Sequence, residues 1–257
     1  MKSLSNLYQY LTQLYPLKYQ EKWDQSGLKV FGNKKDNIDK VLISLDINYG
    51  AINFAIKNKI KLIIAHHPIF TDSEEIKTSF NDLQNIKLLK KHKINIIGLH
   101  TNIDNNPKGL NYYLVNKLPI KKALQKKHQE GTYFEVNLNK NHDQKSLKML
   151  LKNTYQVNCV NSITFSNKIN KLLFCSGSGF NVLSPTFKNI SNNTAIVTGD
   201  IKWHNWQMVN DLKINTFDVG HDVEKWFIEL ITKKLLAFDS SLKLFSYYPD
   251  LKLDIYK

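Results

Sequence analysis

Five of the eight histidines follow short apolar segments at the point where each segment ends. They are His66, His67, His100, His204 and His221. The carboxylates in the same short stretches include Asp104, Asp200 and Glu224. Imidazole and carboxylate groups form mixed nitrogen and oxygen sites that bind Zn, Mn, Fe, Ni or Co, and they also transfer protons as general acids and bases. These residues are therefore the candidates for a metal site and for catalysis.

The adjacent pair His66-His67 is followed by Pro68. Neighbouring side chains of a regular strand point to opposite faces, so the pair could not easily share one ion. Pro68 disfavours helix at His67 and helps to end the strand, and at such a bend two imidazoles can reach two different ions. Taken alone, the motif fits equally well a strand-end pair whose nitrogens are satisfied by water or backbone.

The carboxylates have structural interpretations as well. Asp104 closes the string HTNID, where it could bind a metal, but Asn102 and Asp104 could also cap a following helix. His221 and Glu224 are three residues apart at the start of a predicted helix, which places both on one face. Glu224 could bridge two ions, or it could be an acidic residue that stabilises a helix start. The convergence of several such segments favours the metal interpretation.

The elements that must position these residues follow from hydrophobic periodicity. The apolar segments predict strands at 41–47, 61–65, 94–99, 195–198 and 214–220. Helices are predicted at 52–58, 82–93, 109–117, 204–212 and 223–237, and an amphipathic first helix contains Leu4, Leu7, Leu11 and Leu14. This alternation indicates an α/β fold with mostly parallel or mixed sheets covered by helices. Ligands of such sheets bind at the carboxyl ends of the strands, where we expect the metal site.

The middle of the chain has a different pattern. Residues 133–138 alternate like an edge or antiparallel strand, 146–154 indicate a helix, and 162–165 and 171–175 indicate short strands. The sequence therefore predicts two α/β lobes. Residues 1–125 and 191–257 would form the first lobe, which carries the metal site, and residues 126–190 a second, smaller lobe.

The formal net charge is +14, and all 36 basic residues are lysines. Proteins that read nucleic acids usually rely on arginine for bidentate and stacked contacts. The lysines are also spread along the whole chain, so we expect nucleic-acid binding to be weak or unspecific.

No apolar run approaches the roughly 18 residues of a membrane span. The first residues lack the features of a signal peptide. Two isolated cysteines, Cys159 and Cys175, favour a reducing compartment. We therefore expect a cytoplasmic protein without a membrane partner.

Two polar strings are weaker candidates for substrate binding. The turn WDQSGL contains Trp23 and Asp24 and could line a pocket, although a structural turn is about as good an interpretation. The string CSGSG contains Ser176 and Ser178, and its amides could cradle a phosphate, although the Walker lysine is missing. With His204, these four residues are the candidate substrate-binding set.

Seven strings occur in an informative order: WDQSGL, SLDIN, IIAHHPIF, GLHTNID, CSGSG, TGDIKWHN and VGHDVEKW. Together they resemble the Nif-three-like dinuclear-metal family, the GTP cyclohydrolase 1 type 2 homologues, over essentially the whole chain. HHP, HTN-x-D and GH-x-x-E in that order are the specific motifs. The resemblance implies a two-lobed α/β fold, toroidal homohexamers and two divalent ions. It also implies the ligands His66, His67, Asp104, His221 and Glu224, with His100 beside the site.

One motif departs from the family pattern. In the family the last glutamate usually follows the histidine by four residues, in the string GHY-x-x-E. Here Glu224 follows His221 by three, and Asp222 comes directly after the histidine as a second candidate ligand.

The implied activity is metal-dependent hydrolysis, with His100 or Asp200 as general acid or base and a nucleotide such as GTP as substrate. One alternative is a metal-dependent phosphoesterase or amidohydrolase acting on another nucleotide or metabolite. Another is a non-enzymatic, metal-loaded scaffold or regulatory binding protein.

Overall fold

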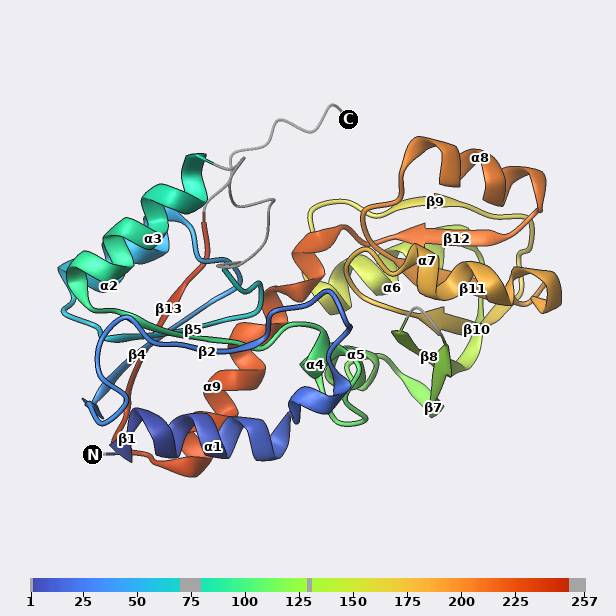
Figure 1. Ribbon diagram of the computed structural model, residues 1–257. Coiled ribbons are helices and arrows are strands. Elements are labelled where there is room, and N and C mark those ends of the chain that lie inside the picture. The colour runs from blue at the N-terminus through green and yellow to red at the C-terminus, as the bar shows by residue number, and fades with distance from the viewer. Residues whose placement is uncertain (1, 70–79, 129–130, 250–257) are drawn as a thin grey trace. The chain divides into compact units, whose positions relative to one another are not determined.

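The computed structural model of the protein describes residues 2–69, 80–128 and 131–249 (Figure 1). The chain divides into two compact units. The first unit comprises Met1–Asn102 and Phe227–Lys257, and the second comprises Ile103–Trp226. Each unit contains one large sheet with helices packed on it. The predicted α/β class with mostly parallel or mixed sheets is therefore confirmed.

The first unit is built on a five-stranded sheet in the order β13-β4-β5-β6-β2. Four of its strands are parallel: β4 (Lys40–Ser44), β5 (Leu62–Ala65), β6 (Asn95–Gly98) and β13 (Lys243–Tyr247). The edge strand β2 (Gly27–Lys29) is antiparallel to β6. Every residue of β5 and β6 is buried. This explains why both strands are continuous apolar runs in the sequence instead of alternating ones.

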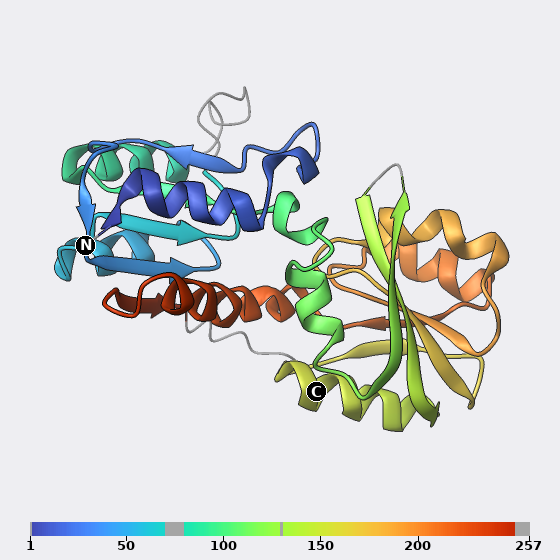
Figure 2. The same cartoon turned by 90° about the horizontal axis from the view of Figure 1, so that it is seen from below.

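Helices cover both faces of this sheet (Figures 1 and 2). One face carries α2 (Tyr49–Lys57) and α3 (Phe80–His92), and the other carries α1 (Leu4–Leu14) and α9 (Trp226–Phe238). Leu4, Leu7 and Leu11 are fully buried, as their helical spacing predicted. Three smaller elements lie outside this sheet, namely β1 (Lys2–Ser3), η1 (Leu17–Tyr19) and β3 (Asn37–Ile38), and β1 pairs antiparallel with β3.

The second unit has a mixed six-stranded sheet in the order β7-β8-β10-β11-β12-β9. Its parallel centre consists of β10 (Ile169–Phe174), β11 (Thr194–Thr198) and β12 (Asn215–Asp218). The strands outside this centre pair antiparallel to their neighbours: β7 (Ile120–His128), β8 (Gly131–His142) and β9 (Asn161–Ile163).

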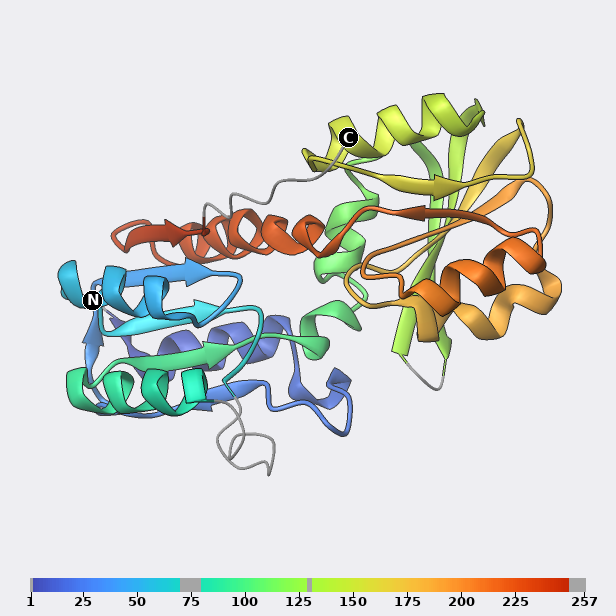
Figure 3. The same ribbon diagram turned by 90° about the horizontal axis from the view of Figure 1, so that it is seen from above.

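Helices also lie on both faces of the second sheet (Figure 3). Helix α6 (Gln144–Tyr155) covers one face, and α7 (Phe180–Leu183), η3 (Ser184–Asn189) and α8 (Trp203–Asp211) cover the other. Asp143 caps α6, because its side chain accepts a hydrogen bond from the amide of Ser146. The short helices are α4 (Thr101–Asp104), α5 (Leu110–Val115) and η4 (His221–Lys225). Helix α4 contains the candidate ligand Asp104, and η4 contains His221 and Glu224.

The sequence-based division of the chain differs from the observed one. We predicted that residues 191–257 return to the first lobe, but β11 and β12 belong to the second sheet, and the chain returns to the first unit only at Phe227. Buried parallel strands have the same apolar pattern in either sheet, so periodicity cannot assign them. Strand β7 was not predicted at all, because four lysines in its sequence IKKALQKKH hide the alternation. Lysines are common on exposed edge strands, and β7 is the edge of its sheet.

No helix within the described part of the chain is both long enough and apolar enough to cross a membrane.

Candidate metal centre

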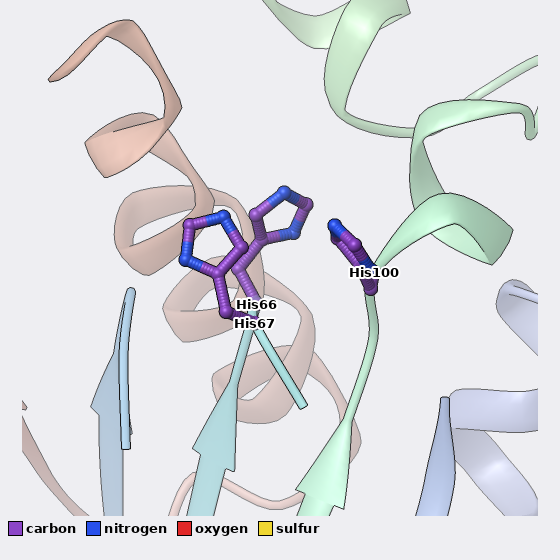
Figure 4. Close-up of side chains that lie close together, drawn as sticks. All are labelled: His66, His67 and His100. Atoms are coloured by element: carbon purple, nitrogen blue, oxygen red, sulfur yellow. The ribbon is translucent and has the colours of Figure 1, made fainter. Parts of the chain in front are cut away.

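Three histidines of the first unit gather beyond the carboxyl ends of β5 and β6 (Figure 4). The ladder continues past β5, since the amide of His67 donates to the carbonyl of Leu45 over 2.9 Å. On the other side of β5, the amide of Leu99 donates to the carbonyl of Ala65, also over 2.9 Å. His100 follows Leu99 directly, so this bond fixes the backbone from which His100 extends. One ligand-type nitrogen from each of His66, His67 and His100 lies within 4.8 Å of the others. The hydrogen bonds that extend the sheet therefore fix the backbone that carries these three histidines.

The adjacent rings of His66 and His67 both extend beyond the end of the strand (Figure 4). Their centroids lie 4.8 Å apart, with the ring planes inclined by 54°. A regular strand would send the two side chains to opposite faces, so this arrangement depends on the bend before Pro68. His66 is fully buried and packs against the ring of Phe227 at a centroid distance of 5.2 Å.

The Nδ1 atoms of both rings contact oxygen atoms. Nδ1 of His66 lies 2.9 Å from the carbonyl oxygen of Leu99, and Nδ1 of His67 lies 2.6 Å from Oδ1 of Asp46. A carbonyl or a carboxylate can only accept, so Nδ1 carries the proton in both rings. The neutral form of each imidazole then has its lone pair on Nε2, the atom that binds a metal when Nδ1 is held in this way.

Asp24 holds His100 in a similar way. Its carboxylate lies 3.1 Å from Nδ1 of His100 and accepts further hydrogen bonds from Ser26 Oγ (2.7 Å) and from the amide of Thr101 (3.0 Å). Burial alone would raise the pKa of Asp24, but the hydrogen bonds from His100, Thr101 and Ser26 outweigh it and lower the pKa to about 2. The carboxylate is therefore ionised and fully enclosed.

The predicted role of Asp24 in substrate binding is corrected by this geometry. The side chain of Asp24 is buried and its oxygens are bonded within the protein, so it positions His100 instead. Trp23, the other candidate in this turn, is 62% exposed and contacts the ring of His100 edge to face at a centroid distance of 5.5 Å.

In the second unit, three glycine-containing loops follow β10, β11 and β12 and pack together. The amide of Gly199 donates to the carbonyl of Gly177 over 2.8 Å. A Cβ atom at Gly199 would lie 2.7 Å from the carbonyl oxygen of Gly220, closer than real Cβ contacts occur. Glycine is therefore required where the loops meet, and the packed loops place Asp200 and His221 side by side.

His221 lies between two carboxylates. Its Nδ1 is 2.5 Å from Oδ2 of Asp200, and its Nε2 is 2.9 Å from Oε2 of Glu224. The hydrogen bond to Asp200, and then that to Glu224, raise the pKa of His221 to about 11. The hydrogen bond from His221 lowers the pKa of Asp200. A cation bound at Nε2 would take the place of the proton that this atom shares with Glu224.

The short spacing between His221 and Glu224 is accommodated by a 3₁₀ turn. We predicted a helix over 223–237, but His221–Lys225 form the 3₁₀ helix η4 and α9 begins at Trp226. A 3₁₀ helix has three residues per turn, which brings residues three apart into line. Asp222 forms an ion pair with Lys225 at 2.7 Å, whereas Glu224 is buried beside His221. Glu224, and not Asp222, is therefore the carboxylate next to the imidazole.

Asp104 ends α4 and contributes a second carboxylate to the second unit. One of its oxygens and one oxygen of Glu224 lie within 4.8 Å of each other. Burial, and then the negative charges of Asp104 and Glu224, raise the pKa of the Cys175 thiol. Cys175 therefore remains a protonated thiol beside these carboxylates.

The remaining substrate-binding candidates have different environments. Ser178 Oγ donates to Oδ2 of Asp200 over 3.1 Å, so it supports the carboxylate that holds His221. The amide of Ser176 donates to Oδ1 of Asn111 over 2.8 Å, which removes this amide from the predicted phosphate cradle. His204 lies on the exposed side of α8.

We expected all the candidate residues to follow strands of one sheet, but they follow strands of two different sheets. The residues from His66 to His100 follow strands of the first sheet, and Asp200 and His221 follow strands of the second. Asp46 was missed by the sequence analysis. It comes just after β4, so the rule that singled out the other strand ends would have found it as well.

The protein is thus built from two α/β units, and histidine and carboxylate side chains follow the ends of their strands. These side chains form clusters that could hold metal ions. The chain belongs to the Duf34/NIF3 (NGG1p interacting factor 3) family, whose pattern it matches over residues 2–247. The family recognised from the sequence motifs is therefore confirmed.

Relatives of known name support this membership. A Ureaplasma parvum protein called GTP cyclohydrolase 1 type 2 homolog is 31% identical over 241 residues, which cover 89% of this chain and 88% of that protein. A Helicobacter pylori protein called GTP cyclohydrolase 1 type 2 is 27% identical over 227 residues, 88% of each chain.

Solved structures show the same fold. A hypothetical protein from Staphylococcus aureus superposes with a TM-score of 0.83 at 22% identity, covering 99% of both chains. A Bacillus cereus protein related to NIF3 superposes with a TM-score of 0.82 at 18% identity, covering 100% of this chain and 99% of that one.

Proposed function

We propose that the protein binds two divalent metal ions and uses them in a hydrolytic reaction. The proposed ligands are His66 and His67 of the first unit and Asp104, His221 and Glu224 of the second. One observation carries the proposal: Nδ1 of each of the three histidines is held by an oxygen that can only accept. These oxygens belong to Leu99, Asp46 and Asp200, respectively. Metal-binding histidines are held in this way, and the donor set of imidazole and carboxylate fits a transition metal.

Divalent ions bound by such a set would lower the pKa of bound water and stabilise an oxyanion. The side chains of the chain itself supply orientation and proton transfer. Asp200 is bonded to His221 and Ser178 and its pKa is lowered, so it orients His221 instead of donating a proton. His100 has its Nδ1 held by Asp24, and the lone pair on its Nε2 can accept a proton or bind an ion.

The proposed substrate is a nucleotide or a related heterocyclic metabolite. The name GTP cyclohydrolase 1 type 2 of the relatives suggests GTP, whose imidazole ring would be opened by water with loss of formate. Trp23 supports a substrate with a flat ring, because its exposed indole lies beside His100 and can stack on a base. No arginine is present, so lysines and backbone amides would have to hold the phosphates.

Elemental analysis of the purified protein tests the metal proposal. We expect close to two ions per chain in the wild type and a marked loss in both His66→Ala and His221→Ala. His92→Ala is a matched control, because His92 lies at the end of α3 and is not a proposed ligand. A wild-type protein that retains no ion after purification in metal-containing buffer would refute the proposal.

Incubation with GTP and a series of divalent ions tests the substrate. Release of formate and the fluorescence of a pterin product would support GTP. An absence of turnover with every ion would exclude GTP and leave metal binding standing. A screen of phosphoesters and amides would then distinguish a phosphoesterase or an amidohydrolase.

A binding protein is the second candidate function. The family name refers to a protein interaction, and the net charge of +14 would attract an acidic partner. If the metal has a regulatory role, variants of the ligands would lose partner binding and not only turnover. Binding that disappears by about 0.3 M salt whatever the partner would indicate unspecific attraction.

The toroidal homohexamer implied by the family resemblance also stays a proposal. Sedimentation of the wild-type protein measures it directly, and a monomer at micromolar concentration would refute it.

A further inference from the structure

The mixed sheet of the second unit has a groove on the face that carries η3. Strands β8 and β10 form its floor through Tyr133, Glu135, Lys171 and Leu173, and residues of η3 and the chain just after it form its wall. The groove has a volume of about 320 Å³. Pockets that hold small molecules measure about 300–1,000 Å³. None of the lining residues is a proposed metal ligand, so the groove is a separate feature of the second unit.

The pairing of the strands places further lysines beside the floor of the groove. Lys126 of β7 pairs with Tyr133 of β8, and Lys122 of β7 pairs with Asn137 of β8. Lys171 of β10 pairs with Asn137 from the other side. Residues that pair directly across two strands lie on the same face of a sheet. Lys122 and Lys126 therefore share the face of the groove with Lys171, and the three lysines stand on both sides of β8.

The positive charge on this face exceeds what its acidic residue can neutralise. Glu135 forms an ion pair with Lys171 at 3.5 Å. Neither Lys122 nor Lys126 has an ion-pair partner in the part of the chain that the structure describes. Three lysines against one glutamate leave a net charge of +2, and β7 contains no acidic residue at all. An anion would therefore be attracted to this face.

Tyr133 adds a hydrogen-bond donor to the floor. Only 9% of this residue is exposed. Burial, and then the negative charge of Glu135, raise the pKa of Tyr133, so its hydroxyl stays protonated at neutral pH. Among the described residues this hydroxyl has no hydrogen-bond partner. It can therefore donate to an oxygen atom of a bound molecule.

We propose that the groove binds a small molecule that carries a phosphate monoester. Such a group has a charge of about −1.5 to −2 at pH 7, which complements the three lysines and the one glutamate. Lysine ammonium groups bind phosphate as point charges, and a tyrosine hydroxyl donates to its oxygens. The apolar side chains of Leu173 and Ile190 contact the rest of the molecule. This inference does not rest on the proposed metal binding.

Titration calorimetry of the full-length protein with AMP tests the proposal. AMP supplies a phosphate monoester and a flat apolar ring. The titration is repeated in EDTA, which removes ions that could hold the phosphate at the metal centre. We expect one AMP per chain with the same affinity in both conditions. Adenosine lacks the phosphate and cyclic AMP carries only one negative charge, so both should bind more weakly, by about tenfold or more.

Substitutions of exposed lysines locate the site without disturbing the core. Lys122→Gln combined with Lys126→Gln should weaken AMP binding by about tenfold or more. Lys145→Gln combined with Lys148→Gln is the matched control, because it removes the same charge from α6, which covers the opposite face of the sheet. Glu135→Gln should strengthen AMP binding, since it removes the carboxylate that competes for the lysines.

Hydrogen exchange provides a second measure of the location. Bound AMP should slow the exchange of amides in residues 185–194, which line the groove. It should leave the amides of α6 (Gln144–Tyr155) unchanged, because this helix lies on the other face. Equal slowing in both segments, or none in residues 185–194, would contradict binding in the groove.

The other outcomes also decide the question. Equal losses of affinity in the two double-lysine variants would show that only the overall charge attracts AMP, and would overturn the proposal. Affinity that disappears in EDTA would assign AMP to the metal centre and leave the proposed function standing. If a short oligothymidylate binds but AMP does not, the surface binds single-stranded nucleic acid instead. A protein that binds neither AMP nor inorganic phosphate would refute the inference.

Discussion

Gly177 lies directly against the carboxylate of Glu224. A Cβ atom built at Gly177 would overlap Oε1 of Glu224, and the residue has φ +58, in the left-handed region. The loop after β10 therefore holds the candidate ligand through a backbone surface that only glycine can provide. The glycine of the string CSGSG therefore has a structural reason that does not involve phosphate binding.

Gly177→Ala should both strain the loop and displace Glu224. The left-handed conformation costs a non-glycine residue roughly 1–2 kcal/mol, and the new methyl group also pushes the carboxylate away from His221. We expect a lower thermal midpoint and a weaker affinity for Zn²⁺, measured by calorimetry and chelator competition. Gly220→Ala is a control for strain, because Gly220 has φ +71 but meets nothing closer than 4.0 Å. Equal Zn²⁺ affinities in the two variants would contradict the role of the contact with Glu224.

Asp46→Asn should weaken metal binding without loss of fold. The carboxylate of Asp46 fixes the tautomer of His67 and makes its Nε2 more basic. Loss of such a partner usually lowers metal affinity by about 10–100-fold. Asp39→Asn is the matched control, since Asp39 is exposed and directly precedes the first residue of β4, at the end of the strand away from Asp46. Chelator competition measures the effect, and an affinity equal to that of the control would show that Asp46 does not support a ligand.

The stability of protein stripped of metal should depend on pH through His221. Its pKa of about 11 lies above the ordinary histidine pKa of 6.5. The contribution of its ion pairs to stability is therefore complete below about pH 6.5 and is lost as the pH rises through about 11. We expect the thermal midpoint to fall between pH 7 and pH 10 in the presence of a chelator. His221→Asn should flatten this fall, and identical profiles for both proteins would contradict it.

Asp24 should make the stability of the protein depend on pH in the opposite direction. Its pKa of about 2 lies below the ordinary aspartate pKa of 3.8. Its contribution to stability is therefore present above pH 3.8 and is lost as the pH falls through about 2. The shift corresponds to about 2 kcal/mol. Asp24→Asn should be less stable by about this amount at pH 7 in urea unfolding with a chelator present. The difference from the wild type should shrink as the pH approaches 2, whereas Asp39→Asn should show little difference at any pH. A constant difference down to pH 2 would show that the charge of Asp24 is not responsible.

The positions of the two strands that precede the candidate histidines could be predicted closely from the sequence. Strand β5 was predicted at 61–65 and lies at Leu62–Ala65, and β6 was predicted at 94–99 and lies at Asn95–Gly98. Both are buried on two faces and therefore appear as unbroken apolar runs bounded by polar residues. The histidines that follow them were found by the same rule.

The partners of these histidines could not be found in this way. Asp24 precedes His100 by 76 residues in the chain, and only the antiparallel pairing of β2 with β6 brings the two together. The 3₁₀ geometry of η4 was also not predicted, because a spacing of three residues fits either type of helix. Long-range pairing and local backbone geometry are not contained in the periodicity of a single segment.

The order of the two units along the chain has a consequence for synthesis. The second unit is one continuous stretch, whereas the sheet of the first is completed only when β13 pairs with β4 and Lys243 meets Lys40. Domains fold as units while they leave the ribosome. The loops around His221 can therefore form while the strand beside His66 and His67 still lacks its outer neighbour. A nascent chain that stalls before Lys243 would present some of its proposed ligands on a complete sheet and the others on a sheet that still lacks β13.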